Sequence, residues 1–163
     1  MSSPRGIRHI TSAWLLIGGI LMSGSVLAQQ PSDMDAVKAA NQAFYAALSA
    51  HDVAAMQKVW SSDADTQNIG PRDKAIIVGW DNMKKGFERL FDSFPELKVS
   101  MEPEPRIKIV GAVAWASGIE QAQRKDKNGA SSSGANLATN IFQKQDGRWL
   151  MVYHHASHAT VTS

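Results

Sequence analysis

The chain has 163 residues with 17 Lys+Arg, 15 Asp+Glu and no cysteine, which gives a formal net charge of +2. This length predicts a single domain with one sizeable hydrophobic core, and the absence of cysteine excludes disulfides, thiol catalysis and cysteine-based metal sites. Basic residues do not gather in the clustered patch that nucleic-acid binding requires, so no nucleic-acid partner is expected.

The N-terminal segment has the layout of a secretory signal peptide. Two arginines precede an apolar run at 13–22, which is too short to span a bilayer, and residues 26–28 (VLA) have the pattern of a cleavage site. We therefore expect a signal peptide over 1–28, cleaved after Ala28, and a periplasmic or secreted domain over 29–163 with no membrane span. An uncleaved anchor or a buried helix is the alternative. The expected signal holds two basic residues and no acidic ones, which leaves 15 of each sign in the mature chain.

The mature chain begins with apolar residues at the spacing of a helix. Ser32, with an aspartate three residues later, forms a capping box, and apolar residues at three- and four-residue spacing then predict a helix over 34–50. Asp52 is placed to cap a second, short helix over 53–60. Residues 63–69 are expected to form a short strand or extended segment before a Gly-Pro break.

A third helix and a set of strands follow. Asp81 is expected to cap the helix, and Pro95 to end it. The apolar pattern then changes to a period of two over 97–123, which predicts strands, and residues 128–136 (NGASSSGAN) have the composition of a loop. Helices first and strands last in one domain indicate an α+β fold, with a mostly antiparallel sheet and helices on one face.

The C-terminal thirty or so residues predict a long β-hairpin. Two alternating runs meet at the Asp-Gly pair 146–147, which is the strongest short-range hairpin signal. Strict alternation places Tyr153 and His155 on one face of the second strand and His154 on the other, while Asn140 lies among apolar residues of the first strand. Polar groups among large apolar ones are typical of the wall of a pocket.

Three segments, taken in this order, resemble the nuclear transport factor 2-like superfamily and its SnoaL-like branch. They are AFYAALSAHDVAAMQKVWSSDA at 43–64, GWDNMKKGFERLF at 79–91 and FQKQDGRWLMVYHHAS at 142–157. Ketosteroid isomerase, scytalone dehydratase and the SnoaL-like polyketide cyclases belong to this superfamily. The closing segment is especially similar to relatives of the association domain of calcium/calmodulin-dependent kinases. The resemblance covers residues 34–158.

The resemblance implies a fold, an assembly and a pocket. The fold is a cone: a strongly bent, mostly antiparallel sheet wrapped around the N-terminal helix, also described as a cystatin-like α+β barrel. Members are often dimers and some form rings, so a homodimer or higher homo-oligomer is expected. The inside of the cone is a pocket of the usual apolar kind, which implies a small, largely apolar organic ligand.

Ketosteroid isomerase chemistry needs a general base and neutral donors that stabilise an oxyanion. The resemblance puts the phenolic donor at the position of Phe44, with Tyr45 one residue away, and the catalytic carboxylate at the position of Asn68. Phenylalanine cannot donate a hydrogen bond and asparagine is no base, so this particular isomerase activity is not expected. Asn140 stands where association-domain relatives carry an arginine, so an anionic ligand group is not expected at that position.

The candidate catalytic residues are Tyr153, His155 and Asp63. The resemblance aligns His155 with the second histidine of a closing His-x-His pattern and Tyr153 with the first; a half-buried structural histidine at an edge or dimer interface is the alternative. Asp63 and Asp65 would share one face of an extended segment, where one carboxyl could have a raised pKa. The alternative is that Asp63 only stabilises a turn. The other residues expected to line the ligand pocket are Tyr45, Trp60, Asn68, Trp80, Trp115 and Asn140.

Neither a metal nor another cofactor is expected. His154 and His155 point to opposite faces of a strand and cannot share one ion without distortion. The sequence therefore predicts an exported protein that binds a small, largely apolar molecule and can support cofactor-free isomerase, dehydratase or cyclase chemistry. Two alternatives stay open: a non-catalytic homo-oligomeric association module, and an accessory domain that binds a partner protein in the cell envelope.

Overall fold

The computed structural model describes residues 32–159, and the expected signal peptide at 1–28 lies outside them. In chain order the elements are α1 (Asp33–Ser49), α2 (Val53–Val59), β1 (Gln67–Ile69), β2 (Ile77–Val78), α3 (Trp80–Ser93), β3 (Glu96–Met101), β4 (Arg106–Val110), β5 (Val113–Lys125), β6 (Ser131–Gln145) and β7 (Arg148–His158). Of the helices within this range, none has the length and apolar character needed to cross a membrane.

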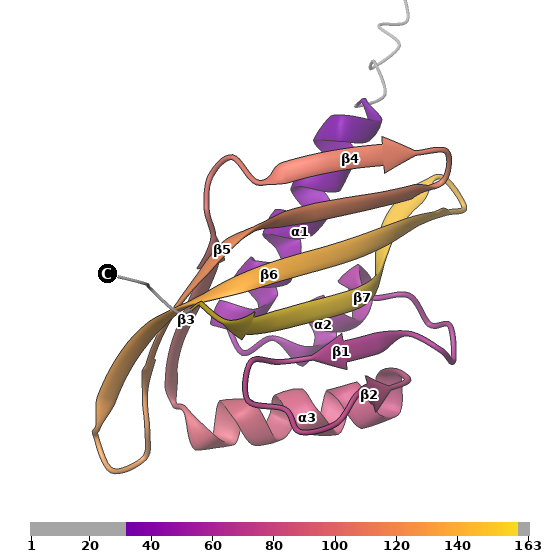
Figure 1. Cartoon of the computed structure of the whole chain (residues 1–163). Helices are drawn as coiled ribbons and strands as arrows, with labels where there is room; N and C mark the ends of the chain where they lie inside the picture. The colour runs from indigo at the N-terminus through magenta and orange to yellow at the C-terminus, as the bar shows by residue number, and fades with distance from the viewer. Residues whose placement is uncertain (1–31, 160–163) are drawn as a thin grey trace, which may run out of the picture.

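One bent sheet of seven strands forms the body of the domain. Its order is β2-β1-β7-β6-β5-β3, and β4 pairs with the first part of the β5 edge that β3 continues. Among these strands, every pairing is antiparallel except that of β1 with β7, and an isolated bridge between Trp60 and Met151 is also parallel. Helix α1 crosses one face of the sheet, and α3 lies along the end that carries β1 and β2 (Figure 1). The predicted α+β architecture, a bent sheet around the N-terminal helix, is confirmed.

Local sequence signals begin the first two helices. The Ser32 side chain accepts a hydrogen bond from the backbone N–H of Asp35 at 3.2 Å, and Asp52 Oδ1 accepts one from that of Ala55 at 2.8 Å, which confirms both predicted caps. Helix α3 differs, because its N-cap is Gly79, with φ of 79° and no side-chain cap, and Asp81 lies inside the first turn. In the first turn, the carboxylate of Asp81 still interacts favourably with the dipole of helix α3.

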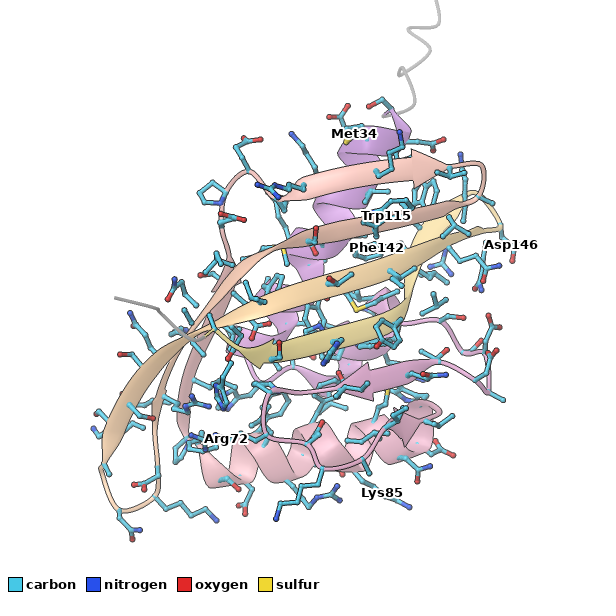
Figure 2. The ribbon with its side chains drawn as sticks, in the orientation of Figure 1. Met34, Arg72, Lys85, Trp115, Phe142 and Asp146 are labelled. Carbon is cyan, nitrogen blue, oxygen red and sulfur yellow. The ribbon has the colours of Figure 1, made fainter. Side chains whose placement is uncertain are left out.

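The hydrophobic core lies between α1 and the sheet. Phe44 on α1 and Phe142 on β6 are almost fully buried, and Met151 on β7 packs in the same cluster. Phe142 is labelled on β6 in Figure 2. Burying a side chain of this size stabilises the fold by roughly 1.5–3 kcal/mol. The sheet is therefore held against α1 by large apolar side chains, without disulfides.

The predicted loop at 128–136 is wrong for most of its length. Residues 131–136 belong to β6 and pair with residues 120–125 of β5, so only a short turn around 126–130 joins the two strands. Serine and glycine favour loops in isolation, but the continuous ladder of backbone hydrogen bonds with β5 decides the conformation here. The extension places Asn136 on the sheet, where it matters for the site below.

The closing hairpin is confirmed, but its second strand does not alternate strictly. Asp146 and Gly147 both have positive φ, 48° and 78°, as the predicted tight turn requires. Further along, Ile141 pairs with Tyr153 while its neighbour Phe142 pairs with Met151, so Val152 is one extra residue in β7.

This β-bulge at Val152 changes which side chains face inward. Strict alternation would give Met151, Tyr153 and His155 the same face. Because a bulge adds one residue to one strand, the residues after it change face. Met151 and His154 are buried, whereas His155 is exposed. The predicted alternation is therefore wrong beyond Met151.

Candidate functional site

A cavity of about 430 Å³ opens between α1, α3 and the inner face of the sheet. Its apolar wall is made by Phe44, Leu48, Ile77, Phe87, Leu90, Phe94, Leu97, Val99 and Ala122. Four further lining residues are polar and buried, and we call them the buried polar set: Asn68, Glu120, Asn136 and His154. An apolar cavity with a few convergent polar groups is the usual form of a small-molecule site.

Glu120, on β5, is the acidic member of the buried polar set and is 4% exposed. Burial raises the pKa of its carboxyl group, and this effect exceeds the opposing influence of Asn136, Tyr45 and the charge of Arg124. The side-chain amide of Asn136 donates to Glu120 Oε1 at 2.8 Å. A carboxyl group with a raised pKa in an apolar cavity is suited to general acid–base catalysis.

His154, on β7, is a neutral imidazole. Burial first, and the nearby His155 second, lower its pKa to about 3. Asn140 uses its side-chain amide to donate to Asn41 Oδ1 at 2.7 Å and to the Tyr45 hydroxyl at 3.2 Å. Its Oδ1 therefore accepts the hydrogen bond of 2.6 Å from His154 Nδ1. This tautomer leaves Nε2 of His154 as an acceptor.

Tyr45, on α1, lies between this network and Glu120. Burial, followed by the charge of Glu120, raises the pKa of its phenol well above the ordinary value, so the group remains protonated. Its hydroxyl accepts a hydrogen bond of 3.2 Å from Asn140. Hydrogen bonds thus run from His154 through Asn140 to Tyr45, and the charge of Glu120 acts on the far end of this network. The hydrogen bond from Asn136 orients Glu120 relative to the cavity.

The predicted pocket residues on the closing strands divide between the two faces of the sheet. Asn140 is buried on the inner face and belongs to the hydrogen-bonded network. Tyr153 is half-buried and His155 exposed, and His155 lines a shallow depression on the outer face together with Arg106 and Thr139. The bulge at Val152 is the reason, so the structure puts neither Tyr153 nor His155 in the cavity.

The three predicted tryptophans do not line the cavity. Trp115 is 37% exposed on the outer face of β5, away from the residues that line this cavity. Trp60 is a core residue, with its ring centroid 6.0 Å from that of Phe44. Trp80, the first residue of α3, lines a separate depression beside α2 and β7.

Of the remaining predicted residues, Asn68 and Asp63 lie in different parts of the structure. Asn68 is one of the residues that line the cavity. Asp63 is exposed, and its Oδ2 accepts a hydrogen bond from Gln145 Nε2 at 2.7 Å. Residues 64–65 form a turn rather than a strand, so Asp63 and Asp65 do not share a strand face. The backbone oxygen of Asp63 accepts from the N–H of Thr66 at 3.2 Å, which is the turn role given above as the alternative.

Three members of the buried polar set were missed by the sequence analysis: Glu120, Asn136 and His154, which strict alternation placed on the opposite face from the expected pocket residues. Glu120 has the same parity along its strand as Ala114, Ala116 and Ala122, all of which are buried. A charged residue on a face otherwise built of small apolar residues is a signal that the sequence does contain. Asn136 had no such signal, because its segment has the composition of a loop.

A family model described as a SnoaL-like domain matches residues 37–161. The chain belongs to the SnoaL-like domain family. No protein with a curated description matches the SnoaL-like chain. In residues 32–159 of this SnoaL-like protein, no group of three or more histidine, aspartate or glutamate side chains is placed to hold a metal ion.

Solved structures share the fold of this SnoaL-like domain. A nuclear transport factor 2-like superfamily protein from Salmonella enterica is 17% identical, with a TM-score of 0.72 over 78% of this chain and 91% of its own. A ketosteroid isomerase-like protein from Erwinia carotovora is 16% identical, with a TM-score of 0.68 over 79% of this chain and 98% of its own. The CamKII hub homology domain from Chlamydomonas reinhardtii is 26% identical, with a TM-score of 0.63 over 79% of this chain and all (100%) of its own.

Proposed function

We propose that this SnoaL-like protein is exported, binds a small, largely apolar molecule in its cavity and moves a proton on that molecule without a cofactor. The reaction class is that of an isomerase, dehydratase or cyclase. The observation that carries this proposal is Glu120, a buried carboxyl with a raised pKa at an apolar cavity. The structural likeness to a ketosteroid isomerase-like protein supports the same class.

Glu120 has the central part in the proposed reaction. Its raised pKa keeps it protonated to higher pH than an exposed glutamate, so it can give a proton. Once ionised, it is a stronger base than an ordinary carboxylate and can take a proton back. The side-chain amide of Asn136 holds the carboxyl in place by donating a hydrogen bond to it. Neutral His154 and Asn68 offer hydrogen bonds that orient polar atoms of the bound molecule.

Export is the part of the proposal that rests on the sequence alone. The basic start, the short apolar run and the cleavage pattern support it. Native mass spectrometry of the full-length protein, expressed in a bacterium and recovered from the periplasm, tests export and binding together. We expect a polypeptide that begins at Gln29 and carries a small organic molecule. A mass that retains Met1 contradicts export, and a protein that carries no molecule contradicts the binding proposal.

Replacing Glu120 by glutamine tests the proposed chemistry. The two side chains have the same shape, so we expect E120Q to bind the retained molecule within a few-fold of the wild type. Its kcat for conversion of that molecule should fall by about 100-fold or more, because glutamine cannot transfer the proton. Glu88, exposed on α3 and absent from the cavity lining, gives the control variant E88Q. A kcat for E120Q within about threefold of E88Q would contradict the role of Glu120.

The outer face of the sheet favours the association module as a second candidate. Val113 and Trp115 on β5 and Leu137 on β6 are exposed apolar residues, with Leu137 56% exposed. Exposed apolar patches of this kind mark interaction surfaces, and the similar hub homology domain is consistent with pairing of copies. The same native spectrum tests this candidate. A ligand-free dimer or ring supports the association module, whereas a monomer contradicts it.

A further inference from the structure

Two arginines share one aromatic ring at the mouth of the cavity. Arg72 lies in the segment between β1 and β2, and Arg124 lies on β5. Their guanidinium carbons are 5.6 and 5.8 Å from the ring centroid of Phe94, the residue that follows α3. All three residues line the cavity, and Arg72 is labelled beside the C-terminal end of α3 in Figure 2. Segments far apart in the sequence thus bring two positive charges to one place.

Neither arginine is in an ion pair. None of the ion pairs formed within residues 32–159 includes Arg72 or Arg124, although the acidic residues Asp73 and Glu120 line the same cavity. Burial first, and the charge of Arg72 second, lower the pKa of Arg124 against the opposing charge of Glu120. Arg124 is held in position by a hydrogen bond of 3.2 Å from its Nε to Ser132 Oγ. Two neighbouring positive charges that are not in ion pairs favour an anion bound between them.

The interior of the cavity is different in character. Beyond the mouth, most of the wall is made of aromatic and aliphatic side chains, among them Phe44, Phe87 and Leu97, and the buried polar set adds no positive charge to it. A charged group placed there would lose its hydration without a charged partner, which is costly. An anionic end of a bound molecule would therefore stay at the mouth, and its apolar part would fill the interior. Guanidinium groups match a planar carboxylate with paired hydrogen bonds.

We propose that the ligand class is an apolar carboxylic acid, bound with its carboxylate on Arg72 and Arg124 and its hydrocarbon part against the aromatic wall. This inference rests on the proposed function, because it names the class of molecule that the cavity takes. It also places the chemistry. With the carboxylate held at the mouth, Glu120 faces a carbon in the apolar part of the acid, away from the carboxylate. The carboxylate would contribute to binding only, and the proton transfer would occur at another part of the molecule.

The test compares a matched pair of probes, 4-phenylbutyrate and its neutral amide, by isothermal titration calorimetry with the mature protein at low salt. We expect the acid to bind about tenfold more tightly than the amide. R72Q and R124Q should each weaken binding of the acid about tenfold and leave binding of the amide unchanged. Arg106, which lines the outer depression, gives the control variant R106Q, which should bind both probes as the wild type does.

The outcomes separate this inference from the proposed function. If the acid and the amide bind equally, and R72Q and R124Q change neither, the carboxylate site is overturned while binding of apolar molecules stands. If neither probe binds, the inference and the proposed apolar cavity both fail. Raising the salt concentration gives an independent readout, because the preference for the acid should shrink while binding of the amide stays constant.

Discussion

His154→Asn is expected to remove most of the acid sensitivity of folding between about pH 6.5 and pH 3. In the wild type, burial lowers the pKa of His154 from 6.5 to about 3 in the folded state. Within that window the unfolded chain binds a proton that the folded chain does not, so stability falls as the pH decreases. The contribution is fully present above pH 6.5, and its loss approaches about 5 kcal/mol at the acid end.

Urea denaturation at about pH 7 and about pH 5 measures this effect. The wild type should lose about 2 kcal/mol of unfolding free energy between the two conditions, and H154N should lose much less. Asparagine is a suitable replacement because its amide can still donate to Asn140 Oδ1 and does not titrate. The control is H158N, since His158 is exposed at the end of β7 and does not contribute to the lowered pKa of His154, and this variant should follow the wild type. Equal pH dependence in H154N and H158N would contradict the assignment.

Asn140→Leu is expected to destabilise the fold by about 3 kcal/mol or more. Asn140 is fully buried and serves three partners: Asn41, Tyr45 and His154. Leucine fills a similar space but leaves an acceptor on Asn41, an acceptor on Tyr45 and a donor on His154 without partners. Each buried polar group left unpaired costs roughly 1 kcal/mol or more.

Thermal and urea unfolding of N140L measure the cost directly. Thr139 is the neighbour that faces outward, so T139V is the matched control and should change stability by no more than about 0.5 kcal/mol. A second variant, N41L, removes one partner, and the N41L/N140L pair should cost less than the sum of the single changes. A loss below about 1 kcal/mol in N140L would show that the network contributes little.

The elements that could be predicted are those whose cause is local in the sequence. Ser32 and Asp52 cap their helices through bonds to N–H groups only three residues away. The turn at Asp146 and Gly147 depends on two residues that accept positive φ. Residues 131–136 were misassigned because their conformation depends on β5. The serine and glycine residues of this segment do not indicate that it pairs with another strand.

The site was predicted less well, and the error on β7 has a clear physical reason. Assigning a face to a strand residue requires counting along the strand, and a single extra residue shifts every later count. Val152 is that residue, and it moved the inward histidine from the expected His155 to His154. Glu120 could have been found, because β5 contains no bulge and the buried residues of the same parity are Ala114, Ala116 and Ala122.

The bulge at Val152 affects the curvature of the sheet independently of which side chains face inward. Without Val152, Met151 would be followed directly by Tyr153 and then His154, so both buried side chains would still face inward in a regular strand. What the extra residue adds is therefore local curvature, since a bulged strand bends and twists more strongly than a regular one. The identity of the groups inside the cone and the width of the cone are set by different positions. A deletion at position 152 can therefore change the width of the cavity, and so the size of ligand that it accepts, while the same side chains still face inward.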